Sequence, residues 1–136
     1  MIRKRLNYIN WDEYFMGIAI LSSMRSKDPN TQVGACIVNP DNRIVGTGYN
    51  GLPRGYDDDE FDWTREGNLL ESKYGRIIHA EPNAIFNATT TNLKDCKIYV
   101  TLHPCHDCIK DIVQKEISEI IYLEDKYKDK IGRAHV

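Results

Sequence analysis

Hydrophobic and polar positions follow a helical period near the start of the chain. Apolar residues recur every three or four positions from Tyr14 to Leu21, which is the spacing of one helix face. Asn10 precedes them and Glu13 follows three positions later, the arrangement of a capping box at a helix N-terminus. The pattern predicts a helix over residues 11–25.

Short apolar runs separated by turn residues predict strands. The expected strands cover residues 35–38, 44–49, 97–101 and 119–123, and the expected later helices cover residues 79–88 and 104–115. Residues 51–75 are polar, acidic and without periodicity, so we expect a long loop, which in a compact domain is usually functional or disordered. Helices and strands alternate in the second half, which predicts an α/β fold with a partly parallel sheet of four strands.

Length and charge narrow the class of protein. The chain has 136 residues, 41% of them hydrophobic, and a net charge of −2. We therefore expect a single domain, residues 1–136. A basic surplus that would hold a nucleic-acid backbone is missing, and no apolar run approaches the roughly 20 residues of a membrane span. A cytoplasmic protein that binds neither nucleic acid nor a membrane is the expectation.

A Cys-x-x-Cys pair indicates metal or redox chemistry. Cys105 and Cys108 are three positions apart at the start of a predicted helix, so both sulfurs lie on one face, and a helix N-terminus stabilises thiolates. His79, at the start of another predicted helix, can supply a third ligand. Three protein ligands leave a fourth tetrahedral position for water, which is typical of a catalytic zinc ion.

Glu81 lies two residues after His79 and is the candidate proton carrier for that water. The full pattern H-x-E…P-C-x-x-C is that of zinc deaminases of cytosine and adenine bases. Cys-x-x-Cys alone is weaker, because it also occurs in redox-active and structural sites. A structural zinc would need a fourth ligand, for which His103 and His106 are the nearby candidates.

Further segments resemble one family. Residues 26–38 (SKDPNTQVGACIV), 48–51 (GYNG) with Pro53, and 125–127 (DKY) resemble the deoxycytidylate (dCMP) deaminases of the cytidine deaminase superfamily. The resemblance covers nearly all of residues 11–128. It implies a three-layer α-β-α fold, Zn²⁺ on His79, Cys105 and Cys108, Glu81 as proton shuttle, and hydrolytic deamination of dCMP to dUMP.

The resemblance also implies substrate contacts. It implies Asn39 at the sugar, Arg25, Lys126 and Tyr127 at the phosphate, and backbone groups of Ala80 and Leu102 at the base. Each side chain has an ordinary alternative: Asn39 as a hairpin-turn residue, Arg25 as a solvated helix end, and Lys126 and Tyr127 as part of a solvated tail.

Residues Gly48, Tyr49, Asn50 and Gly51 resemble the family's allosteric motif, at which dCTP with Mg²⁺ activates and dTTP inhibits. The two glycines would let backbone N–H groups approach phosphates, and a plain turn is the alternative. The resemblance also implies a homo-oligomer, from dimer to hexamer.

Two features depart from the family. Pro82 follows Glu81, where Met, Leu or Gln is expected, and proline is tolerated in the first turn of a helix. After Tyr127 the family continues with a helix and a fifth strand, whereas residues 131–136 (IGRAHV) look like the translation of a short-read sequencing adapter. We expect a domain truncated after about residue 130, with strand 119–123 left as an exposed edge.

Other functions stay open at this point. A related zinc deaminase could act on another nucleoside, nucleotide or base, although the acidic residues 57–60 argue against RNA. An inactive nucleotide-binding or zinc-binding fragment is the second alternative. Glu81 argues against it, because a structural zinc has no use for a proton carrier.

Overall fold

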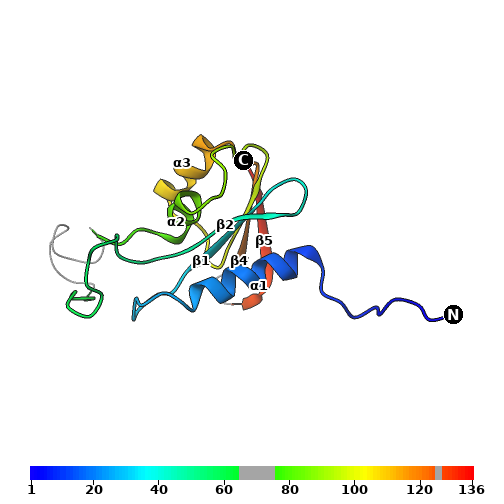
Figure 1. Ribbon diagram of the computed structural model, residues 1–136, viewed down its shortest axis with the longest axis horizontal. Coiled ribbons are helices and arrows are strands. Elements are labelled where there is room, and N and C mark those ends of the chain that lie inside the picture. Colours follow the sequence, from blue (N-terminus) through cyan, green and yellow to red (C-terminus); the bar gives the residue numbers. More distant parts are fainter. Residues whose placement is uncertain (65–75, 125–126) are drawn as a thin grey trace.

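A mixed sheet lies between α1 on one face and α2 with α3 on the other (Figure 1). The computed structural model describes residues 1–64, 76–124 and 127–136. The helices are α1 (Trp11–Ser23), α2 (Ala80–Phe86) and α3 (His106–Gln114), and the strands are β1 (Gly34–Val38), β2 (Ile44–Tyr49), β3 (Lys97–Val100), β4 (Glu119–Glu124) and β5 (Tyr127–His135). The three-layer α-β-α architecture is confirmed. In the described part of the chain, no helix is long and apolar enough to cross a membrane.

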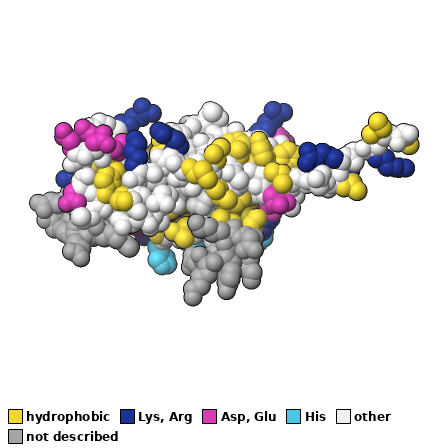
Figure 2. All heavy atoms as spheres, turned by 90° about the horizontal axis from the view of Figure 1, so that it is seen from below, with side chains coloured by type: hydrophobic (Ala, Val, Ile, Leu, Met, Phe, Trp, Pro, Cys, Tyr) yellow, Lys and Arg dark blue, Asp and Glu magenta, His cyan; other side chains and the backbone are white. Residues whose placement is uncertain are grey.

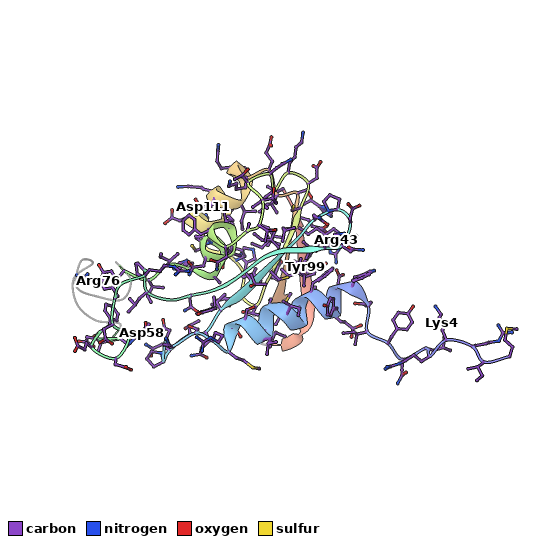
Figure 3. All side chains as sticks on the ribbon, viewed as in Figure 1. Lys4, Arg43, Asp58, Arg76, Tyr99 and Asp111 are labelled. Carbon is purple, nitrogen blue, oxygen red and sulfur yellow. The ribbon has the colours of Figure 1, made fainter. Side chains whose placement is uncertain are left out.

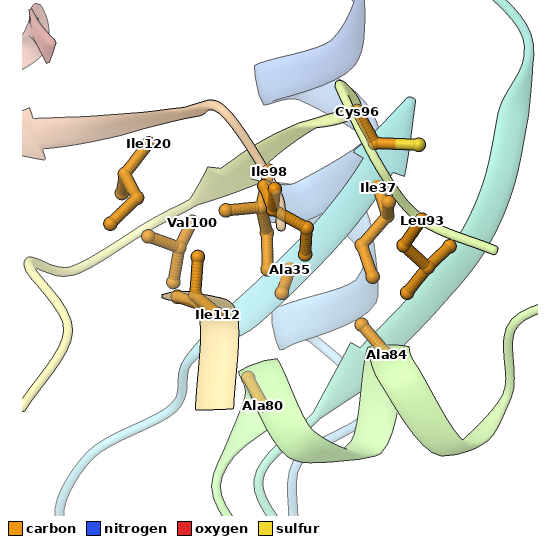
Figure 4. Close-up of a cluster of buried hydrophobic side chains, with 11 residues drawn as sticks. Ala35, Ile37, Ala80, Ala84, Leu93, Cys96, Ile98, Val100, Ile112 and Ile120 are labelled. Carbon is orange, nitrogen blue, oxygen red and sulfur yellow. The ribbon is translucent and has the colours of Figure 1, made fainter. Parts of the chain in front are cut away.

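Strand β1 separates the two halves of the core. All five of its residues are buried, and successive side chains point to opposite faces of a sheet. Ala35 and Ile37 pack in the cluster that contains residues of α2 and α3 (Figure 4). Cys36 and Val38 pack in the cluster that contains the buried face of α1. The sheet is therefore covered on both sides, which fits the near-continuous apolar run of β1.

The sheet has five strands in the order β2-β1-β3-β4-β5, so the expectation of four strands is wrong. Strands β3 and β4 are parallel, and β5 pairs antiparallel with β4. Arg133 of β5 also forms ion pairs with Asp12 of α1 and with Glu119 of β4. The edge of β4 that we expected to be exposed is therefore covered, because its free N–H and C=O groups pair with the returning chain.

The helix boundaries follow their caps. The capping box of α1 is confirmed, since the Asn10 side chain accepts from the Glu13 N–H at 2.8 Å and Glu13 accepts from the Asn10 N–H at 3.1 Å. The later helices are shorter than predicted, because His79 and Cys105 are extended N-cap residues. Pro104 thus precedes α3 rather than beginning it.

Tyr99 of β3 joins the sheet to α1. Its ring packs against Phe15 with centroids 5.4 Å apart, and its hydroxyl donates to Asp12 Oδ1 at 2.6 Å. Figure 3 shows Tyr99 close to α1 in the middle of the fold. This hydrogen bond satisfies a polar group of a buried side chain, as buried hydroxyls require.

Candidate active site

Two helix N-termini bring the candidate metal ligands together. His79 is the N-cap of α2 and Cys105 is the N-cap of α3, with Cys108 in the first turn of α3. The His79 Nδ1 atom lies 3.1 Å from Cys108 Sγ and 3.5 Å from Cys105 Sγ, and the two sulfurs are 3.4 Å apart. Residues 29 positions apart thus form one compact cluster.

These distances fit a tetrahedral zinc ion. Zinc binds nitrogen at about 2.0 Å and sulfur at about 2.3 Å, so its ligand atoms lie roughly 3.5 Å from one another. Within the described residues, the group of candidate ligands contains His79, Cys105 and Cys108 and no fourth member. His103 packs instead with its ring 4.6 Å from that of Tyr122. A set of three ligands is typical of a catalytic rather than a structural zinc.

The surroundings of Cys108 favour the neutral thiol. Burial raises the pKa of the Cys108 thiol above its usual range, and the nearby Glu81 carboxylate raises it further. A coordinated divalent cation reverses this effect and deprotonates a coordinating thiol. Cys108 is therefore not a free, reactive thiolate, and a bound cation would be needed to deprotonate it.

Glu81 is a buried carboxyl group beside the cluster. It lies in the first turn of α2 and is 3% exposed. Burial raises its pKa, while a hydrogen bond with Cys108 and the charge of His79 work in the opposite direction. A carboxyl group in such an environment can hold and release a proton during a reaction.

The cluster opens into a cavity of about 210 Å³. Its wall is formed by Asp28, Thr31, Val33, Asn50, Ile77, His79, Ala80, Glu81, Leu102, His103 and Cys105. Asp28, Thr31 and Asn50 form a polar part of this wall, which sequence reasoning did not assign to the site. The turn signal of residues 28–30 gave no sign of it, because Asp28 and the first turn of α2 line the same cavity only in the folded chain.

Asn50 was predicted as part of an allosteric motif, and the structure places it in the cavity wall. Its side chain accepts from the Val33 N–H at 2.9 Å and donates to the Thr31 carbonyl at 2.9 Å. Ser26 donates to the Asn50 carbonyl at 2.9 Å. Asn50 therefore holds the segment that forms the polar wall.

The other members of this motif have structural contacts of their own. A Cβ on Gly48 would lie 2.3 Å from the Ala84 nitrogen and 2.6 Å from the Ala80 carbonyl oxygen, so this glycine lets α2 lie on β2. The N–H of Asn50 donates to Val33, and the N–H of Gly51 donates to Ile78. These two N–H groups are therefore already hydrogen-bonded. Tyr49 lies under the Arg25 guanidinium, 5.9 Å from the ring centroid.

The predicted substrate contacts are brought together only in part. Ala80 and Leu102 line the cavity. Arg25 lies next to Ser26, which bonds to Asn50, but is not part of the wall. Lys126 lies outside the described residues. Tyr127 begins β5, and its side chain also lies outside the described part.

Asn39 directly follows the C-terminal end of β1, whereas Val33 of the cavity wall precedes the N-terminal end of this strand. The Asn39 side chain accepts from the N–H groups of Asp41 and Arg43, each at 3.0 Å. Figure 3 shows Arg43, which bonds to Asn39, far from Arg76. Arg76 is adjacent in the sequence to Ile77, a residue of the cavity wall. The hairpin-turn alternative accounts for both side-chain bonds, and this placement gives the predicted sugar contact no support.

The fold and the site together define a class. A three-layer α-β-α domain with His-x-Glu at one helix N-terminus and Cys-x-x-Cys at another is the arrangement of zinc-dependent nucleobase deaminases. Residues 9–124 match the family described as the cytidine and deoxycytidylate deaminase zinc-binding region, and the chain belongs to this family.

Named relatives are consistent with this membership. The chain is 54% identical to the deoxycytidylate deaminases of Pongo abelii and of Homo sapiens, over 128 residues that cover 93% of this chain and 72% of each relative. Among solved structures, dCMP deaminase from the cyanophage S-TIM5 in complex with dCMP and dUMP matches with a TM-score of 0.65 and 27% identity. That match covers 81% of this chain and 78% of the phage chain.

Proposed function

We propose that this chain catalyses the zinc-dependent hydrolytic deamination of dCMP to dUMP. The observation that carries the proposal is the compact cluster of His79, Cys105 and Cys108. His79 and Cys105 line a cavity, and the buried Glu81 lies in the same wall. The similarity to deoxycytidylate deaminases supports dCMP as the substrate.

His79, Cys105 and Cys108 hold the zinc ion in this proposal. When bound, Zn²⁺ supplies a water molecule whose pKa is lowered to about 7. Glu81 takes the proton of the attacking water and transfers it to the ring nitrogen beside the attacked carbon. It then takes the remaining proton of the same water and passes it to the departing amino group. A carbon–oxygen bond replaces the carbon–nitrogen bond, ammonia leaves, and Glu81 returns to its starting state.

The substrate is proposed to lie in the cavity beside the cluster. Backbone groups of Ala80 and Leu102 would contact the base, because both residues form part of the wall. Arg25 is proposed for the phosphate, since it lies beside the segment that Asn50 holds. Lys126 and Tyr127 are proposed for the same phosphate on the resemblance alone.

We further propose regulation by nucleotides, with dCTP and Mg²⁺ activating and dTTP inhibiting through residues 48–51. Because the N–H groups of Asn50 and Gly51 are engaged in the fold, the exposed parts of Tyr49 and its neighbours would have to contact an effector. A cytoplasmic homo-oligomer, from dimer to hexamer, completes the proposal.

The test is a turnover assay that follows the ultraviolet change as cytosine becomes uracil, on protein with quantified zinc. The substrates are dCMP, deoxycytidine and cytosine, each with and without dCTP and Mg²⁺. We expect turnover of dCMP only, increased by dCTP. Turnover of deoxycytidine or cytosine at a comparable rate would favour a related deaminase, and no turnover with about one zinc per chain would favour an inactive fragment.

A further inference from the structure

The face of α1 that points away from the sheet is apolar. Phe15, Met16 and Ala19 are the buried side of the helix. At 3.6 residues per turn, the opposite side carries a stripe of four residues, Tyr14, Gly17, Leu21 and Met24. We call these four residues the outer stripe. Leu21 is 62% exposed and Met24 is 72% exposed.

This composition is unusual for a surface helix. Between Glu13 and Arg25 the chain contains no charged residue, whereas the solvent face of a helix in a soluble protein is normally polar. Figure 2 looks at the molecule from the side of α1 and shows hydrophobic side chains gathered on this face. A helix that is hydrophobic all round is normally buried, so the outer stripe requires a cover.

Gly17 leaves open space at the middle of the stripe. A Cβ at this position would meet no atom within 4 Å, so nothing within the described part of this chain requires a glycine there. Glycine inside a helix costs roughly 0.5–1 kcal/mol relative to alanine. Its benefit is that a second helix backbone can approach closely at the middle of the stripe.

The charges at the two ends of α1 favour a second copy of the same chain, in antiparallel orientation. Glu13 lies in the first turn of α1, and Arg25 follows its C-terminal end. Their neighbours Asp12 and Lys27 are already ion-paired within the chain, with Arg133 and with Asp58. An antiparallel pair brings the acidic end of one helix near the basic end of the other. A parallel pair would bring like charges together.

The stripe is also self-complementary about its centre. With the two-fold axis near the level of residue 19, Gly17 of one copy lies opposite Leu21 of the other, and Tyr14 lies opposite Met24. A large side chain then faces a small one at the centre of the contact. In a two-fold interface each such pair occurs twice, as symmetry requires.

We propose that the outer stripe of α1 is a two-fold interface between copies of this chain, with the two helices antiparallel. The proposal rests on the homo-oligomer part of the proposed function and names the surface that forms it. It requires no change in the active-site cavity, because none of the four stripe residues lines that cavity.

The first test is sedimentation equilibrium of the zinc-loaded protein and of the variant Leu21→Glu. We expect the wild-type protein to form dimers or larger assemblies, and the variant to dissociate with a dissociation constant at least tenfold higher. The matched control is Val113→Glu, which changes a side chain on α3 that is 49% exposed, and it should assemble like the wild type. Met24→Glu is a second variant, at a C-cap, that leaves the helix interior unchanged.

The second test is cross-linking by cysteines under mild oxidation. A mixture of the Tyr14→Cys protein and the Met24→Cys protein should give more cross-linked dimer than either protein alone, measured above the wild-type background. Equal cross-linking by the single proteins would contradict the antiparallel register.

These outcomes separate the two proposals. A wild-type protein that is monomeric at high micromolar concentration would overturn both the homo-oligomer and its interface. An assembly that Leu21→Glu and Met24→Glu leave intact would overturn only the interface proposed here. Turnover of dCMP is measured independently of both.

Discussion

Gly48 and Ala84 are in contact through their backbones. A Cβ on Gly48 would lie 2.3 Å from the Ala84 nitrogen, so β2 and α2 approach each other at a distance that only glycine permits. Since α2 carries Glu81 and begins after His79, this contact sets the position of both candidate site residues relative to the sheet.

Gly48→Ala should therefore weaken both the fold and the metal site. We expect a loss of about 1–3 kcal/mol in the free energy of unfolding, because an added methyl group forces the backbone apart. A lower zinc affinity should accompany it. The control is Gly51→Ala, where the nearest atom to an added Cβ is 4.0 Å away. Equal effects of the two variants in denaturant titrations and zinc competition would contradict this reading.

Glu81→Gln should retain zinc and lose turnover. The amide keeps the size of the side chain but cannot carry the proton, and general acid–base groups typically contribute about 10²–10⁴-fold to the rate. The assay is the ultraviolet change with dCMP, together with the zinc content of the purified variant. Glu116→Gln, at an exposed glutamate, is the control and should match the wild type. Unchanged turnover of the Glu81 variant would remove this residue from the mechanism.

Cys108→Ser should bind zinc more weakly and lose activity in proportion. Its sulfur lies 3.1 Å from His79 Nδ1 and 3.4 Å from Cys105 Sγ, so it is a central member of the cluster. We expect at least a tenfold drop in zinc affinity by competition with a chelator. Cys96→Ala, at a buried cysteine outside the cluster, should keep its zinc, and a loss of metal there would point to a general effect of unfolding.

Chelation of the wild-type protein should abolish turnover, and zinc should restore it. Magnesium alone should not, because nitrogen and sulfur ligands suit zinc whereas magnesium prefers oxygen ligands. Activity that survives complete removal of zinc would contradict the proposed function itself.

Asn50→Ala and Asn39→Ala should distinguish a residue of the cavity wall from a residue of the hairpin turn. Loss of the Asn50 side chain leaves the Val33 N–H and the Thr31 carbonyl without their partner, which lowers the free energy of unfolding by about 1–3 kcal/mol. Because the cavity wall is then no longer held in place, KM for dCMP should rise. Asn39→Ala removes turn contacts only, so we expect a modest loss of stability at unchanged KM. A raised KM for the Asn39 variant alone would restore the sugar contact that the resemblance implies.

The fold could be predicted from the chain where local patterns dominate. The capping box of α1 joins residues three positions apart, and the apolar run of β1 needs no distant partner to be recognised. The pairing of β5 with β4 could not be predicted in this way. Register and pairing depend on which strand edge is free once the sheet has assembled, and residues 131–135 carry no strong strand pattern of their own.

The candidate site, too, could be predicted from the sequence only in part. Each of the two motifs is short: His79 and Glu81 are two positions apart, and Cys105 and Cys108 are three positions apart. The geometry of a helix N-terminus determines where side chains at this spacing point. Their type and spacing are enough to indicate zinc and a proton carrier. That Asn50 forms part of the cavity wall, and that Asn39 does not, depends on how the ends of β1 and β2 meet α2. Local spacing decides which residues share a helix end, whereas packing between distant segments decides which of them share a cavity.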